Sequence, residues 1–342
     1  LFRSNLDPKK YDIDILEMEH FDKGYEPVPE NVRILKAFQD YRQPRWLRAL
    51  LWRLRIYFPR LTRRLLVKDQ YDVEVSFTIM NPPLLFSKRK EVKKISWIHG
   101  SIEEFLTDLS KRSSHRRQLD AADRIVGISK KTSNSIREVY PEYSQKLTTV
   151  YNGYDFESIL EKSKEKVAID IAPQSICTIG RIEENKGSDR VVEVIRLLHQ
   201  QGKKYHHYFI GAGDMEEELK KQVKEYQLED YVHFLGYQKN PYQYLSKMQV
   251  LLSMSKQEGF PGVYVEALSL GVPFVSTEVG GAEELSQEGR FGKIIESNQE
   301  AAQAIDNYMT ATSSFDVNEA SQFIQQFTIA KQIEQVEKLI EE

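Results

Sequence analysis

The stretch from Ser255 to Ser276, "SKQEGFPGVYVEALSLGVPFVS", predicts the fold of the second half of the chain. The apolar runs "VLLSMS" (250–255) and "PFVSTEVGG" (273–281) are typical of buried strands. Pro261 suits the first turn of a helix, because its missing N–H would have no partner there, and Gly271 suits the end of that helix. The stretch therefore predicts a loop and a short helix between two parallel strands.

Two carboxylates in this stretch need an explanation. Glu258 lies in a loop, whereas Glu266 lies inside the short helix, where a buried charge is costly unless something pairs with it. A diphosphate finds N–H donors and a favourable dipole at such a helix N-terminus. Glu266 then suits the vicinal diol of a ribose, and Glu258 suits a sugar hydroxyl. The alternative is that Glu266 caps a neighbouring loop and Glu258 is solvated.

A second loop supplies positive charge. "TIGRIEENKGSDR" (178–190) places Gly180, Arg181 and Lys186 between a strand and a helix. Arginine binds a diphosphate as a fork and lysine binds it as a point charge. The alternative is a solvated pair on a surface loop. We expect both loops at the same edge of one parallel sheet, where the carboxyl ends of its strands meet.

Strand and helix patterns alternate along much of the chain. Strands are predicted at 11–18, 71–79, 94–100, 122–129, 147–153, 175–180, 205–213, 231–237, 250–255 and 273–281. Helices are predicted at 103–119 and 130–140 and from starts near Ser188, Asp214, Pro241, Pro261 and Ala282. This alternation predicts an α/β protein with two doubly wound, Rossmann-like domains that face each other across a cleft.

The 342 residues are enough for two domains. We expect an N-terminal domain over 1–160, a polar linker over 161–173 and a C-terminal domain over 174–315. Residues 316–342 contain a final helix, Val317–Glu342, which could pack back on the first domain. Gly153 is expected to let the backbone turn into the hinge between the domains.

Composition is that of an ordinary globular protein, with 40% hydrophobic and 29% charged residues. The single cysteine, Cys177, excludes an internal disulfide and favours a reducing cytosolic setting. No stretch approaches the roughly 20 apolar residues of a membrane-spanning helix. The net charge of −3 divides into +7 for residues 1–160 and −10 for the remainder. This asymmetry favours two domains with different partners.

The basic half contains an arginine-rich segment at 41–68, "YRQPRWLRALLWRLRIYFPRLTRRLLVK". It has nine Arg and Lys residues, no acidic residue, and interleaved apolar side chains at Trp46, Leu47, Leu50, Leu51, Leu54, Tyr57 and Phe58. This pattern is typical of an amphipathic helix on an anionic membrane. The alternative is a helix packed on the first sheet with solvated arginines. Nucleic acid is the less favoured partner, because the net charge is negative and no recognition module is visible.

Together, "GR" at Gly180 and Arg181, Lys186 and the pair Glu258 and Glu266 resemble the donor-site signature of the family-4 retaining glycosyltransferases. These enzymes have the two-domain GT-B architecture. The resemblance is strong over 175–296, where "FIGAGD", "VHFLGY" and "GKIIE" stand in family order, and it rests on "SWIHG", "RIVGISKKT" and "VYNGYD" in the first half. Residues 1–18 look like the end of the family's first helix and its second strand, so we expect the first strand and its glycine-rich loop to be absent from this chain.

The resemblance implies a role for each matching residue. Arg181 and Lys186 would bind the nucleotide diphosphate, and Glu266 would bind the ribose hydroxyls. Glu258 would hold the donor sugar and distal phosphate together with the loop residues Gly259, Phe260, Pro261, Gly262 and Val263. Gly236 and Tyr237 would lie near the base. His99 matches the family histidine close to the anomeric carbon, although a lone histidine after a strand is also commonly a structural residue.

The chemistry implied is cleavage of an anomeric C–O bond through an oxocarbenium-like state. Arg181, Lys186 and the helix N-terminus can stabilise the leaving diphosphate without a metal or other cofactor. Asp12 and Asp14 fit strand-edge residues better than metal ligands. His99, Glu258, Arg181 and Lys186 are therefore the candidate catalytic residues.

The sequence thus predicts a metal-independent, retaining hexosyltransferase, with a UDP-sugar as the favoured donor. The acceptor would be a lipid-linked saccharide or cell-surface polysaccharide, as in capsule, cell-wall or glycolipid assembly. The enzyme would lie peripherally at the cytoplasmic face of the membrane. One alternative is an epimerase or phosphorylase of the same architecture, which would need a phosphate or second-sugar site. Another is a non-catalytic subunit that stabilises a partner transferase.

Overall fold

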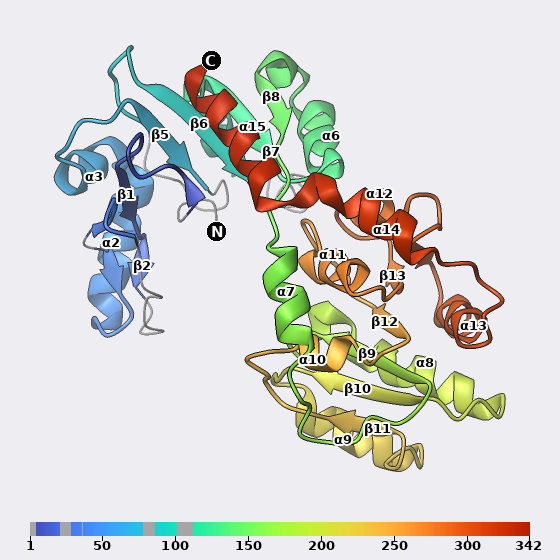
Figure 1. Cartoon of the computed structure of the whole chain (residues 1–342). Helices are drawn as coiled ribbons and strands as arrows, with labels where there is room; N and C mark the ends of the chain where they lie inside the picture. The colour runs from blue at the N-terminus through green and yellow to red at the C-terminus, as the bar shows by residue number, and fades with distance from the viewer. Residues whose placement is uncertain (1–4, 21–28, 36, 78–85, 101–111) are drawn as a thin grey trace. The chain divides into compact units, whose positions relative to one another are not determined.

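The computed structural model describes residues 5–20, 29–35, 37–77, 86–100 and 112–342. The chain divides into two compact units (Figure 1). The first unit comprises Leu1–Gly153 and Ile329–Glu342, and the second comprises Tyr154–Thr328. Among the described residues, no helix is both long enough and apolar enough to cross a membrane.

The second unit is built on one parallel sheet with the strand order β11-β10-β9-β12-β13-β14. Its strands are β9 (Ser175–Ile179), β10 (His206–Ile210), β11 (Val232–Phe234), β12 (Val250–Ser253), β13 (Phe274–Thr277) and β14 (Gly292–Ile295). In order of appearance this is 3-2-1-4-5-6, the order of dinucleotide-binding Rossmann sheets. The order reverses between β9 and β12, which pair through Val250 with Ile176 and Leu251 with Cys177. Ligands of such sheets bind at this reversal point.

Helices alternate with the strands of the second unit. They are α7 (Phe156–Ser163), α8 (Ser188–Gln200), α9 (Glu216–Glu225), α10 (Tyr242–Leu245), α11 (Gly262–Ser269), α12 (Ala282–Ser286), α13 (Asn298–Met309) and α14 (Val317–Ile324). The apolar positions of α8 recur at helical spacing, so Val191, Ile195 and Leu198 are fully buried on one face. They pack with Ile176 and Leu252 from the central strands. Burial of each such side chain contributes roughly 1.5–3 kcal/mol, so the strands that carry the loops of interest are rigidly held.

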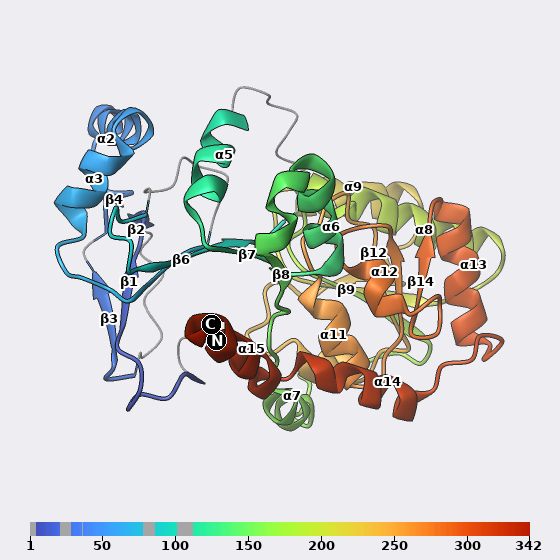
Figure 2. The same cartoon turned by 90° about the horizontal axis from the view of Figure 1, so that it is seen from above.

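The described strands of the first unit form three parallel sheets. The largest has the order β5-β6-β7-β8, and the smaller two pair β1 with β3 and β2 with β4. The strands are β1 (Ile13–Leu16), β2 (Glu19–His20), β3 (Val32–Leu35), β4 (Gln39–Asp40), β5 (Val73–Ser76), β6 (Lys93–Ile98), β7 (Arg124–Gly127) and β8 (Leu147–Thr149). The helices are α2 (Arg45–Tyr57), α3 (Pro59–Leu66), α5 (Arg112–Ala121), α6 (Lys130–Val139) and α15 (Ile329–Glu341). Figure 2 shows α5 and α6 on one face of the four-stranded sheet and α15 on the other.

The boundaries between the units differ from those expected. The predicted linker at 161–173 begins inside α7, which Asp155 caps by accepting a hydrogen bond from the Ser158 amide. The chain instead passes between the units after Gly153. This glycine does not have the left-handed backbone expected of a turn; a Cβ there would stand 2.7 Å from the Ile329 Cα, so the close approach of α15 requires it.

The single final helix expected over Val317–Glu342 is wrong. It is interrupted by a 3-10 turn at Gln325–Phe327, which separates α14 in the second unit from α15 in the first. Lys93 fixes the far end of α15, because its Nζ donates to the carbonyl oxygens of Leu339 at 3.1 Å and Ile340 at 3.0 Å. Of the helix predicted at 103–119, residues 103–111 lie outside the described part, as do 78–79 of the strand predicted at 71–79.

Candidate functional site

The loops that follow β9 and β12 meet at the reversal point of the second sheet. The amide of Lys256 donates to the carbonyl oxygen of Asn185 at 2.8 Å and so ties the two loops together. Gly187 has a φ of +62°, and a Cβ there would lie 2.1 Å from the carbonyl oxygen of Met254. No other residue fits this position, because both the backbone conformation and the close approach exclude a side chain. The expectation that both loops end at one edge of one sheet is confirmed.

A cavity of about 220 Å³ lies between these loops. It is lined by eight residues that the sequence singled out: Gly180, Arg181, Lys186, Glu258, Phe260, Pro261, Gly262 and Val263. Four further residues line it that were not predicted from the sequence: Thr178, Ile179, Ser253 and Ser255. Every one of these residues belongs to the second unit.

Lys186 and Glu258 form an ion pair inside the cavity. The Lys186 Nζ lies 2.6 Å from the Glu258 Oε1, and only 25% and 20% of their side chains are exposed. The hydroxyl of Ser255 donates to the same carboxylate oxygen at 2.9 Å. An ammonium group has three N–H donors, so Lys186 keeps donors for a ligand while Glu258 keeps its second oxygen. The alternative that Glu258 is simply solvated does not hold.

Arg181 is arranged differently. Its side chain is 74% exposed, and one guanidinium nitrogen lies 2.7 Å from the Glu183 Oε2. Exposed ion pairs contribute at most about 1 kcal/mol. The guanidinium can therefore be redirected towards an anionic ligand at little cost.

The end of β13 and the loop after it pack closely against the loop that contains Glu258. Gly280 has a φ of +41°, and a Cβ there would lie 2.4 Å from the carbonyl oxygen of Gly259. A Cβ on Gly281 would lie 2.4 Å from the ring of Phe260. The Thr277 hydroxyl donates to the carbonyl oxygen of Ser255 at 2.5 Å. Gly259 itself does not line the cavity; its carbonyl faces this support.

Glu266 lies one helical turn beyond Gly262 on α11 and does not line the cavity. The phenol of Tyr242 on α10 donates to its Oε1 at 3.1 Å. Desolvation raises the pKa of Glu266, and this hydrogen bond only partly opposes the rise. Among the described residues, the partner of this charge is therefore a tyrosine hydroxyl, and neither a cation nor a loop amide is found to contact the carboxylate.

Gly236 and Tyr237 follow β11 in the second unit. Gly236 has a φ of +65°, and the preceding amide, of Leu235, donates to the carbonyl oxygen of Phe209 at 2.9 Å. The side chain of Tyr237 is 79% exposed. Neither residue lines the cavity, so a base-binding role for them stays a prediction.

His99 belongs to the first unit and directly follows β6. Its side chain is exposed, with its ring centroid 5.9 Å from that of Phe77. Desolvation by nearby protein atoms lowers the pKa of His99, which favours the neutral imidazole at neutral pH. Its assignment to the anomeric carbon stays a prediction.

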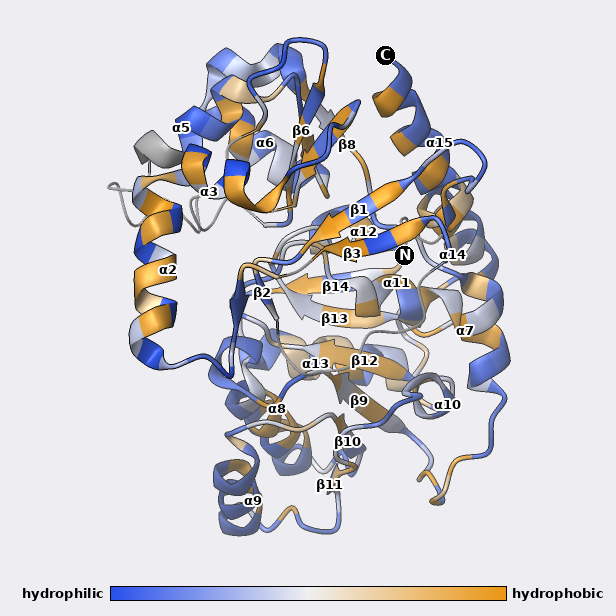
Figure 3. Ribbon diagram, turned by 90° about the vertical axis from the view of Figure 1, so that its left-hand side faces the viewer, coloured by the Kyte–Doolittle hydropathy of each residue, from blue (hydrophilic) through white to orange (hydrophobic). Residues whose placement is uncertain are grey.

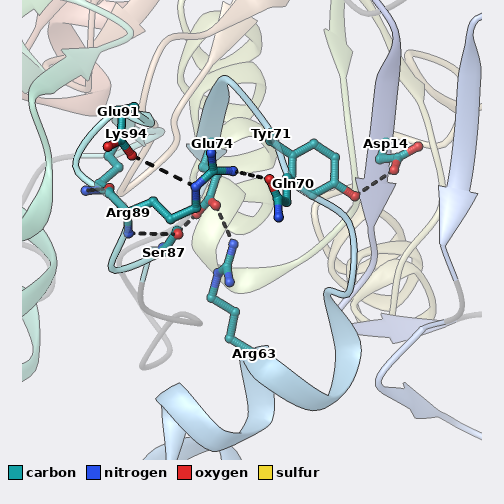
Figure 4. Close-up of polar contacts among 9 residues, drawn as sticks. All are labelled: Asp14, Arg63, Gln70, Tyr71, Glu74, Ser87, Arg89, Glu91 and Lys94. Carbon is teal, nitrogen blue, oxygen red and sulfur yellow. Dashed lines mark hydrogen bonds and ion pairs between the residues drawn. The ribbon is translucent and has the colours of Figure 1, made fainter.

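No group of three or more His, Cys, Asp and Glu side chains in the described part of the chain is placed to hold a metal ion. Asp14 in particular is committed to protein partners. It pairs with Arg33, which lowers its pKa, and it accepts a hydrogen bond from the Tyr71 phenol at 2.6 Å (Figure 4). Asp14 therefore fits the strand-edge role predicted for it.

Two models of protein families match the chain. "Glycosyl transferases group 1" matches residues 160–326, and "Glycosyltransferase Family 4" matches residues 5–158. The chain belongs to the family-4 glycosyltransferases. The matches cover both units of this glycosyltransferase, with only the last residues and a few others outside them.

Curated relatives resemble parts of this glycosyltransferase. The Campylobacter jejuni N-acetylgalactosamine-N,N'-diacetylbacillosaminyl-diphospho-undecaprenol 4-alpha-N-acetylgalactosaminyltransferase is 29% identical over 180 residues, or 52% of this chain and 48% of that protein. The putative colanic acid biosynthesis glycosyltransferase WcaL of Escherichia coli is 30% identical over 165 residues, or 46% of this chain and 40% of that protein. The chain therefore spans about half the length, or less, of these two relatives.

Solved structures share the fold. Anabaena Alr3699/HepE in complex with UDP has a TM-score of 0.69 at 16% identity, covering 91% of this chain and 86% of that one. The apo lipopolysaccharide outer core galactosyltransferase WaaB has a TM-score of 0.69 at 16% identity, covering 91% and 84%. At these identities the likeness shows the fold alone, which is the GT-B fold with two Rossmann-like domains.

Proposed function

We propose that this glycosyltransferase moves a hexosyl unit from a nucleotide diphosphate sugar, with a UDP-sugar as the favoured donor, to a lipid-linked or other cell-surface saccharide. The observation that carries the proposal is the Lys186–Glu258 pair in the cavity between the loops of β9 and β12. A cation and a carboxylate side by side suit a ligand in which a diphosphate adjoins a sugar hydroxyl.

The size of the cavity supports binding of the diphosphate part of the donor. About 220 Å³ is below the roughly 300–1,000 Å³ of sites that enclose a whole drug-sized ligand. The N-terminus of α11 borders the cavity through Gly262 and Val263, and no side chain caps this helix. Its free N–H groups and its dipole favour an anion by about 0.3–2 kcal/mol. Lys186 and Arg181 add positive charge on the opposite loop.

The same groups would assist the reaction. When the anomeric C–O bond breaks, negative charge develops on the departing diphosphate while the sugar becomes oxocarbenium-like. Donors already in place for that charge lower the barrier without reorganisation. We propose that Lys186, Arg181 and α11 play this part without a metal ion, that Glu258 holds a sugar hydroxyl, and that His99 contacts the sugar. Transfer with retention at the anomeric carbon follows from the family resemblance.

The names of related proteins support the choice of donor and acceptor. The Campylobacter jejuni relative is named for transfer to a diphospho-undecaprenol-linked saccharide. The WcaL relative is named for colanic acid biosynthesis, and the Anabaena protein has been solved with UDP-glucose. We therefore propose a UDP-sugar as donor and a lipid-linked saccharide as acceptor.

A lipid-linked acceptor requires access to a membrane, and α2 and α3 offer a surface for it. Their outward side exposes apolar residues, with exposed fractions of 68% for Trp46, 55% for Leu50, 71% for Tyr57, 58% for Phe58 and 59% for Leu65. Figure 3 shows hydrophobic residues along much of α2. Such side chains lie at the level of lipid headgroups in interfacial helices. We propose that this surface holds the enzyme peripherally on the inner face of the cell membrane.

A screen of ligands tests the proposal. UDP, GDP, ADP and their sugars are added to the full chain, and its thermal unfolding is followed. We expect one UDP-sugar and UDP itself to raise the melting temperature, and that sugar to be transferred to a polyprenyl-diphosphate saccharide. Absence of stabilisation by every nucleotide would contradict the donor site. Stabilisation without transfer to any saccharide acceptor would favour the non-catalytic subunit.

A further inference from the structure

The face of α11 that leads away from the cavity carries Gly262 and Glu266. These residues are four positions apart and therefore lie on the same side of the helix. Two phenols lie against this side. A Cβ on Gly262 would stand 2.8 Å from the Tyr154 hydroxyl, and the Tyr242 hydroxyl donates to Glu266. A ligand bound at Gly262 that extends along α11 would therefore reach the Glu266 carboxylate beside these tyrosines.

The hydrogen bond from Tyr242 makes the two oxygens of the Glu266 carboxylate differ in their contacts. Oε1 accepts the Tyr242 hydroxyl at 3.1 Å, and among the described residues no other hydrogen bond to this carboxylate is found. A carboxylate offers about four lone-pair sites, so Oε2 and the second site of Oε1 stay available. Those sites match the two hydroxyls of a vicinal diol.

Fixing the carboxylate in advance helps a ligand to bind. A glutamate side chain loses up to about 2 kcal/mol of rotamer entropy when it is immobilised. A hydrogen bond that already holds it reduces the part of this cost that falls on binding. Tyr242 stands on a different helix from Glu266, so its hydroxyl fixes the carboxylate relative to the rest of the second unit.

We propose that Tyr242 is a positioning residue, whose hydroxyl holds the Glu266 carboxylate in place for the two hydroxyls of the donor ribose. This inference rests on the proposed function, because it assumes that a nucleotide occupies the cavity. It adds a residue outside the cavity lining to the determinants of nucleotide affinity.

The proposal has a pH signature. A diol needs an acceptor, so nucleotide affinity should fall as the pH falls through the pKa of Glu266. Burial raises that pKa and the Tyr242 hydrogen bond lowers it. The titratable groups that face Glu266 are Tyr242 from α10 and Tyr154, which precedes α7. Removing the Tyr242 hydroxyl should therefore move the loss of affinity to a higher pH.

The experiment compares Tyr242→Phe with wild type by calorimetric titration of UDP at several pH values. We expect affinity at neutral pH to fall about threefold to tenfold, the effect of one lost hydrogen bond, and the pH midpoint to rise. Tyr205→Phe is the matched control, since it also removes a phenol bonded to a carboxylate, here Asp306 at 2.6 Å, away from the cavity. It should leave both the affinity and the midpoint unchanged.

Glu266→Gln distinguishes a failure of the positioning role from a failure of the donor site. If Glu266→Gln weakens UDP binding but Tyr242→Phe keeps the wild-type affinity and midpoint, the positioning role is wrong and the donor site stands. An affinity loss in Tyr242→Phe with an unmoved midpoint also overturns it, because it indicates a purely structural effect. If Glu266→Gln leaves UDP binding unchanged, or if UDP does not bind, the assignment of the donor site fails as well.

Discussion

At the scale of single residues, the candidate donor site places charges where folding alone would not favour them. Glu266 is the clearest case, because its carboxylate is desolvated and has only a phenol as a partner. Residues that destabilise the fold and serve a ligand are expected at functional sites. Replacing such a residue should change the stability of the ligand-free protein as well as its affinity for the ligand.

We predict that Glu266→Gln stabilises the ligand-free protein at neutral pH. The folded state raises the pKa of Glu266, so folding disfavours the ionised form. Stability therefore rises as the pH falls through that raised pKa towards the ordinary pKa of a glutamate. The neutral amide avoids this cost. Melting temperatures should therefore differ at neutral pH, and the difference should shrink in acid. A lower melting temperature for Glu266→Gln at neutral pH would show that the carboxylate stabilises the fold instead.

Gly187 gives a second prediction at this scale. Gly187→Ala should destabilise the second unit more than Gly202→Ala. Both glycines have positive φ values, +62° and +78°, but a Cβ meets the Met254 carbonyl at 2.1 Å in the first case and nothing within 4 Å in the second. The shared strain costs about 1–3 kcal/mol, and the clash adds to it at Gly187 alone. Equal losses in chemical unfolding would contradict the tight contact between the two loops.

Several site residues could be predicted from the sequence, because local features reveal them. Gly180, Arg181 and Lys186 follow an apolar run, and Glu258 precedes a proline that starts a helix. Ser253 and Ser255 were missed, although they alternate at the end of a strand and precede Glu258 closely. Tyr242 has no local signal. Its role depends on α10 and α11 lying together, which is a tertiary contact between residues 24 positions apart.

At the scale of elements, the arginines of α2 and α3 divide into an inner group that faces the protein and an outer group that is exposed. The sequence predicted one amphipathic helix, but the segment forms two, and Pro59 begins the second. Arg48 pairs with Glu19 at 2.5 Å, Arg63 pairs with Glu74, and Arg55 is buried. Figure 4 shows Arg63 reaching Glu74, which also accepts the amide of Ser87 at 2.9 Å. The ion pairs of Arg48 and Arg63 fasten the helices to the rest of the first unit.

The outward side of α2 and α3 carries arginines without protein partners in the described part of the chain. Arg45, Arg53, Arg60 and Arg64 are exposed, and among the described residues none of their side chains has an ion pair or hydrogen bond. They stand among the exposed aromatic and aliphatic residues of this surface. The proposed membrane contact therefore rests on these four arginines. The sequence could not separate them from the three arginines of the inner side, because burial of Arg55 and the partners of Arg48 and Arg63 depend on tertiary structure. Those partners, Glu19 and Glu74, lie 29 and 11 positions away.

We predict that reversing Arg53, Arg60 and Arg64 to Glu abolishes sedimentation with anionic liposomes at low salt. Each arginine near an anionic surface contributes about 1 kcal/mol, and the effect fades beyond a Debye length of about 8 Å at physiological salt. Nucleotide binding and the melting temperature should persist, because the three side chains contact no acidic partner.

The matched variant reverses Arg48, Arg55 and Arg63, which face the protein. It should lower the melting temperature, since it places like charges beside Glu19 and Glu74. The membrane contact would be contradicted if the wild type does not bind anionic liposomes, or if the outer-face variant binds them as well as the wild type. The surface would then be a solvated face or an interface with another protein.

At the scale of the whole molecule, the sequence predicted two α/β units but not where the chain passes between them. Alternating apolar runs identify the parallel strands, because each strand is buried between helices. The chain returns from the second unit to the first within Val317–Glu342, where the sequence has an unbroken helical pattern. The break occurs where Thr328 bridges to Tyr154 and the Tyr154 amide donates to the Phe327 carbonyl at 2.8 Å. Such a contact between distant segments leaves no local sequence signal.

The reaction as a whole should not require a divalent cation. We predict that sugar transfer continues in the presence of EDTA, because Lys186, Arg181 and the N-terminus of α11 are proposed to neutralise the leaving diphosphate. The rate is measured with and without the chelator, and with added magnesium or manganese. Complete loss of transfer on chelation, restored by either metal, would assign that charge to an ion instead.

The central claim is that a nucleotide diphosphate binds between the loops of β9 and β12, and titration of UDP into Lys186→Ala tests it most directly. Loss of a hydrogen bond to a charged group costs roughly 1.5–3 kcal/mol, so UDP affinity should fall about tenfold to a hundredfold. Lys203→Ala is the control, because it breaks a 3.0 Å ion pair with Asp306 away from the cavity, and it should bind UDP like wild type. Unchanged UDP affinity in both Lys186→Ala and Glu266→Ala would contradict the account.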